Sequence, residues 1–210
     1  MELLNEQNEQ EMTIEIMKYL REGKRISLIS DCGTPVFADP GKMLVKAALQ
    51  TDDVEMIVVP GVTSIMTALV RSGFDIEQFL YAGFLDRDRQ VRFNEIKQLR
   101  DEPRTVVLLE TPYRLMPVLE AFKHLMPERN AYIGCNLTMK FETHHYGSFE
   151  ELYNKFKNMR FKGEFVIVFE GNRFMKQMGY RIISTSRQDK KTYPKKGGGK
   201  KKFNAKKRKY

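Results

Sequence analysis

The stretch Ile26–Gly41 reads ISLISDCGTPVFADPG, and the stretch Glu55–Ser64 reads EMIVVPGVTS. Each is a short apolar run followed by a loop of Gly, Pro, Thr, Ser or Asp residues. The two apolar runs, Ile26–Ser30 and Glu55–Val59, are predicted to be buried strands. Helices are predicted around them over residues 6–22, 42–50 and 63–72. Because ligands of α/β proteins bind at the carboxyl ends of the strands, both polar loops are candidate ligand loops.

The same alternation of strands and helices continues to residue 170. A third polar strand end, Glu110–Arg114 (ETPYR), follows the apolar run TVVLL. Further strands are predicted over residues 79–83, 105–110, 131–136, 143–147 and 164–170, and helices over residues 91–100, 112–126 and 149–159. We therefore predict an α/β fold with largely parallel sheets. A boundary near residues 72–78 divides it into a partial N-terminal lobe, residues 1–74, and a C-terminal lobe, residues 75–186.

The charge of the chain is concentrated at its C-terminus. The net charge of the 210 residues is +9, yet residues 187–210 contain twelve Lys or Arg against one acid, Asp189. This Lys-rich tail is predicted to be disordered, because it has almost no aliphatic residues to bury. Its composition favours contact with a polyanion, most simply RNA, and the alternative is a solubilising tail.

Several classes of protein are excluded by composition and motif. No apolar run approaches the roughly 18 residues of a membrane span, and the polar N-terminus is not a secretory signal, so we expect a cytoplasmic protein. Two distant cysteines form no disulfide framework or zinc site. There is no GxGxxG, and GGGKKK is not a Walker A loop. His144 and His145 point to opposite faces of a strand and cannot share a metal, so surface or packing roles and no metal site are predicted.

Six segments in fixed order carry a resemblance to a known family. They are ISLISDCGTPVFADPG, VVPGVTSIMTALVRSGF, FLYAGFLDRDR, RTVVLLETPYRL, LTMKFETHHYGSFEEL and KGEFVIVFEG. Together they resemble the tetrapyrrole methylase superfamily, and within it the branch that uses S-adenosylmethionine to 2′-O-methylate a cytidine ribose in small-subunit (16S) ribosomal RNA. The resemblance implies two α/β lobes with the methyl donor in the cleft between them, usually in a homodimer. The partner it implies is ribosomal RNA or the small ribosomal subunit.

The resemblance also implies where the methyl donor binds. Acidic groups would offset the positive charge of the donor, and backbone amides and hydroxyls would hold its carboxylate. For Asp31 the alternative is a loop cap. The implied donor-binding residues are Asp31, Gly33, Thr34, Phe37, Thr63, Ser64, Glu110, Asn136, Leu137, Thr138, Gly163 and Glu164.

The implied reaction is direct transfer of the methyl group to a ribose hydroxyl, in which positioning supplies much of the acceleration. Lys140 and Glu142 are candidates for a general base by their location. Arg114, Lys140 and Lys162 are candidates for holding RNA phosphates. The tail adds Lys200, Lys201, Lys202, Lys206, Lys207 and Arg208 as a wider electrostatic tether.

The chain departs from the family pattern at three places. Thr111–Arg114 (TPYR) replaces Ser-Pro-His-Arg, and Cys135–Lys140 (CNLTMK) replaces Arg-Glu-Leu-Thr-Lys. The family also opens with a strand that ends in a Gly-Asn-x-x-Asp turn, whereas this chain starts near the helix that precedes Ile26. We therefore expect an incomplete first lobe, with its two strands gapped or collapsed. The alternatives are a methyltransferase of a small tetrapyrrole precursor, which the cationic tail disfavours, and a truncated, non-catalytic RNA-binding derivative.

Overall fold

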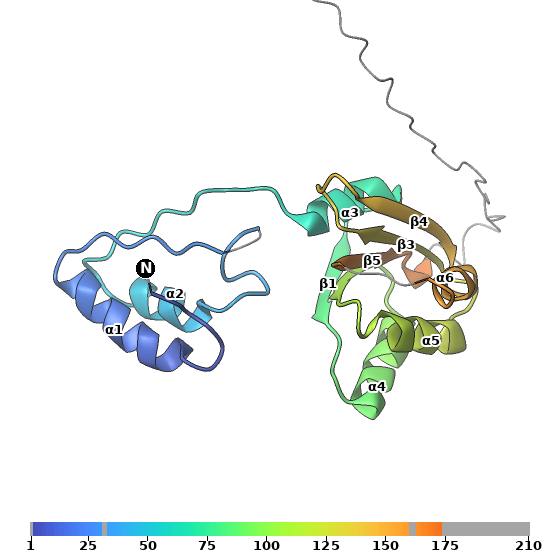
Figure 1. Ribbon diagram of the computed structural model, residues 1–210, viewed down its shortest axis with the longest axis horizontal. Coiled ribbons are helices and arrows are strands. Elements are labelled where there is room, and N and C mark those ends of the chain that lie inside the picture. The colour runs from blue at the N-terminus through green and yellow to red at the C-terminus, as the bar shows by residue number, and fades with distance from the viewer. Residues whose placement is uncertain (1, 31–32, 160–162, 174–210) are drawn as a thin grey trace, which may run out of the picture.

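A computed structural model describes residues 2–30, 33–159 and 163–173 of the chain (Figure 1). Asp31, Lys162 and the whole Lys-rich tail lie outside the described residues. The predicted helices and the last five predicted strands are confirmed within a few residues at each end. The elements are α1 (Glu9–Arg21), α2 (Lys42–Leu49), α3 (Ser64–Ser72), β1 (Phe79–Phe84), α4 (Arg89–Leu99), β2 (Thr105–Glu110), α5 (Leu115–Leu125), β3 (Asn130–Cys135), β4 (Thr143–Ser148), α6 (Phe149–Phe156) and β5 (Phe165–Phe169).

The five strands form one mixed sheet in the order β1-β2-β5-β3-β4. Among the strands of the described residues, β1 and β2 pair in parallel, and the other three pairings are antiparallel. The prediction of a largely parallel sheet is therefore wrong for the described residues. The reason lies in the connections: the short loop between β3 and β4 makes a hairpin, which forces antiparallel pairing, and β5 enters between β2 and β3 in the opposite direction.

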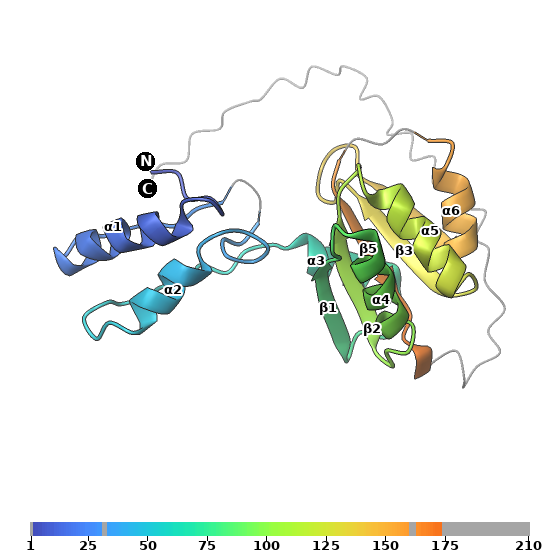
Figure 2. The same cartoon turned by 90° about the horizontal axis from the view of Figure 1, so that it is seen from below.

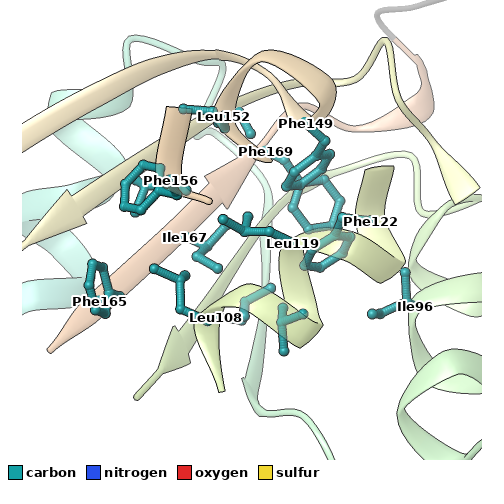
Figure 3. Close-up of a cluster of buried hydrophobic side chains, with 14 of the residues drawn as sticks. Ile96, Leu108, Leu119, Phe122, Phe149, Leu152, Phe156, Phe165, Ile167 and Phe169 are labelled. Atoms are coloured by element: carbon teal, nitrogen blue, oxygen red, sulfur yellow. The ribbon is translucent and has the colours of Figure 1, made fainter. Parts of the chain in front are cut away.

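Side chains that alternate along each strand place a separate core on each face of the sheet. One face packs against α4, α5 and α6 through a large apolar cluster that includes Leu108, Ile133 and Ile167. Figure 3 shows Phe122, Phe149 and Phe169 in this cluster, and the rings of Phe122 and Phe149 stack with their centroids 4.4 Å apart. The opposite face packs against α3 through residues such as Leu69, Val107 and Tyr132.

Helices α1 and α2 pack against each other and lie apart from the sheet (Figures 1 and 2). Their small core contains Ile16, Met17, Leu44 and Ala48. The carboxylate of Glu9 also accepts hydrogen bonds from the backbone N–H groups of Gly41 and Met43, each at 2.9 Å. These two donors lie at the start of α2, where backbone N–H groups have no helical partner. A carboxylate at this position also complements the helix dipole.

The two predicted strands of the first lobe are wrong for the described residues. Residues 26–30 and 55–59 belong to no strand, and most of their apolar side chains are exposed, with Ile29 72% and Val59 82% exposed. An apolar, β-branched run favours extended chain, but a strand also needs neighbours to satisfy its backbone N–H and C=O groups. No described segment forms a sheet with either run, in agreement with the expectation of a gapped first lobe.

An aromatic contact relates the loop before α2 to the sheet. The ring of Phe37, in the loop before α2, stacks on Tyr81 of β1 with the centroids 4.8 Å apart. Helix α3 packs directly on the sheet. Its N-cap, Thr63, accepts a hydrogen bond from the backbone N–H of Ile65 at 3.2 Å. Among the described residues, no helix is long and apolar enough to cross a membrane.

Candidate functional site

One end of the sheet gathers most of the predicted site residues of the C-terminal half. The register pairs Glu110 of β2 with Phe165 of β5, Phe165 with Cys135 of β3, and Cys135 with Thr143 of β4. We call this end the Glu110 edge. Because β4 and β5 run opposite to β2 and β3, the residues after β2 and β3 meet the residues before β4 and β5. Asn136, Glu142 and Glu164 are therefore neighbours at this edge.

Glu110 is a buried carboxylate, only 2% exposed. Its Oε1 accepts the backbone N–H of Thr111 at 2.7 Å and lies 3.3 Å from Nε of Arg114, an ion pair without hydrogen-bond geometry. The guanidinium of Arg114 also donates to the backbone carbonyls of Leu85 and Asp86. These contacts turn Arg114 inward, and the RNA contact predicted for it stays a prediction.

The second oxygen of Glu110, Oε2, is buried and has no hydrogen-bond partner among the described residues. Burial raises the pKa of Glu110, against the opposing effects of the Thr111 hydrogen bonds and of the positive charges of Arg114 and Arg92. A buried polar atom without a partner is costly, and it marks a place where a missing group belongs. Oε2 is therefore suited to accept an N–H or O–H group from a ligand.

The loop Asn136–Thr138 leaves β3 in an unusual conformation. Asn136 has φ 51° and Thr138 has φ 70°, the left-handed region that β-branched residues seldom adopt. The backbone N–H of Asn136 donates to the carbonyl of Glu164 at 3.0 Å, and the side-chain oxygen of Asn136 accepts the N–H of Glu164 at 3.3 Å. The side chain of Asn136 fills the space next to Gly163, where an added Cβ would collide with it. The predicted residues Asn136, Gly163 and Glu164 are thus brought into direct contact.

Glu142 holds the other end of the same loop. Its Oε2 accepts the backbone N–H of Thr138 at 2.8 Å, and its Oε1 lies 3.3 Å from Nε2 of His144. Nδ1 of His144 lies 2.8 Å from the hydroxyl of the buried Tyr132. The hydrogen bond from Thr138 lowers the pKa of Glu142, with help from His144. A lowered pKa makes this carboxylate a weaker base than an ordinary Glu.

The predicted site residues of the N-terminal half make fewer contacts. Gly33 has φ 80°, and the carbonyl of Thr34 accepts the N–H of Phe37 at 3.4 Å in a turn. Phe37 reaches the sheet through Tyr81, as described above. Thr63 is the N-cap of α3 and Ser64 is its first residue, so both have a structural role at the start of a helix. Their predicted roles in donor binding stay predictions.

The remaining predicted residues are either exposed or outside the described part. Lys140 is exposed in the loop between β3 and β4. Asp31, Lys162, Lys200, Lys201, Lys202, Lys206, Lys207 and Arg208 lie outside the described residues.

Sequence reasoning misses two residues near Glu142. It places Tyr132 only within a strand, and it gives His144 only a surface or packing role. The sequence pattern that could have pointed to them is the alternation of side chains along β3 and β4, which places Tyr132 and His144 on the same face of the sheet. The register that makes them neighbours is not readable from the sequence.

Comparison with known proteins places this fold among methyltransferases. The model of the Tetrapyrrole (Corrin/Porphyrin) Methylases family matches residues 1–153. A protein of Halalkalibacterium halodurans named ribosomal RNA small subunit methyltransferase I is 32% identical over 80% of this chain and 58% of its own length. Proteins of the same name from Thermotoga maritima and Escherichia coli O157:H7 are 32% and 34% identical, with 74% and 60% of their lengths covered. The chain thus spans little more than half the length of the first of these relatives.

Solved structures agree on the fold. The methyltransferase CobJ aligns with a TM-score of 0.59 at 15% identity, over 78% of this chain and 72% of its own. Uroporphyrin-III C-methyl transferase from Thermus thermophilus, complexed with S-adenyl homocysteine, aligns with a TM-score of 0.52 at 17% identity, over 80% of this chain and 74% of its own. At these identities the likeness concerns the fold.

Proposed function

Because this chain belongs to the tetrapyrrole (corrin/porphyrin) methylase family, we propose that it transfers a methyl group from S-adenosylmethionine to a ribose 2′-hydroxyl of small-subunit ribosomal RNA. The observation that carries the proposal is the similarity, over 80% of the chain, to proteins named ribosomal RNA small subunit methyltransferase I. A cytidine is the proposed target nucleoside, and the cytoplasmic small ribosomal subunit the proposed partner.

The residues at the Glu110 edge fit a methyl donor of this kind. S-adenosylmethionine supplies, when bound, a methyl group on a positively charged sulfur, together with amino and hydroxyl groups that donate hydrogen bonds. The open Oε2 of Glu110 is an acceptor for one of these groups, and its burial strengthens such a bond. The Asn136–Thr138 loop and Glu164 would complete this side of the donor site, and Gly33, Thr34, Phe37, Thr63 and Ser64 would complete the other.

We assign the remaining charged residues to the RNA. Lys140 is exposed on the loop to which the donor contacts are assigned, and it would meet a phosphate next to the target ribose. The Lys-rich tail would contact the RNA more widely, without sequence preference. A homodimer, as the family resemblance implies, would present two such surfaces.

Ribosomal RNA is preferred over a small tetrapyrrole as the substrate. The relatives named as ribosomal RNA methyltransferases are 30–34% identical to this chain, whereas the solved tetrapyrrole methyltransferases are 15–22% identical. The tail supports the same choice, because a polycation gains affinity for a polyanion and little for a small molecule.

A non-catalytic RNA-binding role is the second candidate, and one observation favours it. The apolar runs 26–30 and 55–59 are exposed and belong to no sheet, so the loops that follow them are not anchored by strands. Without anchoring, the N-terminal side of the donor site would be imprecise, and precision is what methyl transfer requires.

The test is methyl transfer by the full chain. Small ribosomal subunits that lack 2′-O-methylation are incubated with the protein and with S-adenosylmethionine carrying a labelled methyl group, and the RNA is mapped by mass spectrometry. We expect label on one ribose, and its loss in Glu110→Gln, with Glu120→Gln on α5 as the exposed control. RNA binding without any label would favour the non-catalytic role.

A further inference from the structure

With the His144 ring neutral, the hydrogen bonds run in one direction, from Tyr132 through His144 to Glu142. An ionised carboxylate only accepts hydrogen bonds, so Nε2 of His144 carries the proton that faces Glu142. In the neutral ring Nδ1 is then an acceptor, and the hydroxyl of Tyr132 donates to it. Burial raises the pKa of Tyr132 far above its usual value, so the phenol keeps its proton. The chain of donors therefore ends on the carboxylate of Glu142.

A glycine makes room for this arrangement. Gly134 of β3 is the register partner of His144 on β4. A Cβ at Gly134 would lie 2.7 Å from the hydroxyl of Tyr132 and 2.8 Å from a methyl group of Leu137. Leu137 is the buried centre of the Asn136–Thr138 loop. The glycine thus lets the phenol and the loop pack against the same spot of the strand.

The Asn136–Thr138 loop needs contacts with neighbouring residues to keep its left-handed backbone. Left-handed backbone is unfavourable for a residue other than glycine, and such conformations persist only where surrounding contacts fix them. Asn136 is fixed by its two hydrogen bonds to Glu164. Thr138, the β-branched member, is fixed by Glu142. Removing the carboxylate would leave the Thr138 N–H without this partner and release the strain.

We propose that Glu142 is a positioning residue, which His144 and Tyr132 orient and which holds the Asn136–Thr138 loop in the shape that binds the methyl donor. This inference rests on the proposed function and assigns roles to Tyr132, Gly134 and His144 within it. Glu142 acts through the backbone of Thr138 and does not itself take a proton from the substrate. The same carboxylate that is a candidate general base by its place in the sequence is thus a support for the donor loop.

The test compares two substitutions of Glu142 in the full chain. Binding of S-adenosylhomocysteine is measured by calorimetry, and exchange of the Thr138 amide by NMR. Glu142→Ala is expected to weaken binding about tenfold, the usual effect of losing a hydrogen bond to a charged group, and to speed the exchange of the Thr138 amide. Glu142→Gln is expected to restore both, because its amide oxygen still accepts the Thr138 N–H and its NH2 can donate to His144 after a change of tautomer.

The controls separate a positioning role from a loss of stability. Glu120 is an exposed carboxylate on α5, and Glu120→Ala should bind as the wild type does. Tyr132→Phe removes only the hydroxyl, and a smaller loss of affinity is expected. If Glu142→Ala does not fold, Tyr132→Phe decides the question alone.

Three outcomes would overturn the inference. Equal affinity of Glu142→Ala and the wild type would remove the positioning role and leave the proposed methyltransferase intact. Equal losses in Glu142→Ala and Glu142→Gln would show that the carboxylate acts by its charge. No binding to the wild type would overturn the proposed function, and the positioning role with it.

Discussion

The side-chain oxygen of Asn136 occupies the space that a Cβ at position 163 would need. Gly163 has φ 138°, a backbone conformation that residues other than glycine rarely adopt. The side-chain oxygen of Asn136 lies in the space that glycine leaves open, where it accepts a hydrogen bond from the backbone N–H of Glu164. The residues before β5 and after β3 are therefore held together at the Glu110 edge by the packing of Asn136 against Gly163 and by its hydrogen bond to Glu164.

Gly163→Ala is expected to separate these two segments. The added methyl group displaces Asn136 and adds backbone strain, so we expect a loss of about 1–3 kcal/mol in the free energy of unfolding and weaker binding of S-adenosylhomocysteine. Urea unfolding and calorimetry measure the two effects. Gly61→Ala is the control, because a Cβ added there would meet no heavy atom within 4 Å and its φ is not in the left-handed region. Equal stability and equal binding of the two variants would show that the contact of Asn136 with Gly163 does not hold the two segments together.

Thr63→Ala is expected to destabilise α3. The Thr63 side chain accepts the backbone N–H of Ile65, and loss of such a cap typically costs about 1 kcal/mol. Thr63→Ser keeps the hydroxyl and should unfold at nearly the wild-type urea concentration. A Ser variant as unstable as the Ala variant would show that the methyl group of Thr63, rather than its oxygen, stabilises the helix.

His145 should make stability depend on pH. Burial lowers its pKa from 6.5 to about 4, with smaller effects from Lys155 and His144. Between these two pH values the unfolded chain binds a proton that the folded chain does not, so the free energy of unfolding falls as the pH is lowered through this window. The expected loss is about 2–3 kcal/mol between pH 7 and pH 4. The free energy of unfolding of His145→Leu, measured with urea at pH 7 and at pH 4, should fall by less than that of the wild type. An unchanged pH dependence in that variant would exclude His145 as the cause.

Val58 and Val107 give a matched test of the first lobe. Val58 is 71% exposed in the extended run 55–59, and Val107 is fully buried in the sheet. Val58→Thr should leave the free energy of unfolding unchanged, whereas Val107→Thr buries a hydroxyl at a cost of about 1–3 kcal/mol. Urea unfolding compares them. A similar cost at Val58 would show that the run 55–59 is covered in solution.

Removing residues 187–210 should weaken RNA binding and flatten its dependence on salt. The segment carries twelve Lys or Arg against one acid, and each phosphate contact adds roughly 0.7 to the slope of log affinity against log salt for single strands. Filter binding at several salt concentrations measures this slope. Thermal unfolding should be nearly unchanged, and equal slopes for both proteins would assign the tail to solubility alone.

The apolar periodicity of this sequence determined the helices and the strands of the C-terminal half. Runs such as TVVLLE (105–110) and EFVIVFE (164–170) have a strong local preference for extended chain, and the structure confirms both. The motifs also identified the family. These properties are local, because they depend on the order of neighbouring residues.

Tertiary structure decided which segments pair and which polar groups meet. The runs ISLIS and EMIVV have the same local preference, yet neither joins the sheet, because a strand depends on a partner elsewhere in the chain. The antiparallel entry of β5 likewise depends on pairings that the sequence does not reveal. The register of β3 with β4 places Tyr132 next to His144. His144 in turn contacts Glu142, which accepts the backbone N–H of Thr138. Register is a property of two strands at once, and no single stretch of sequence contains it.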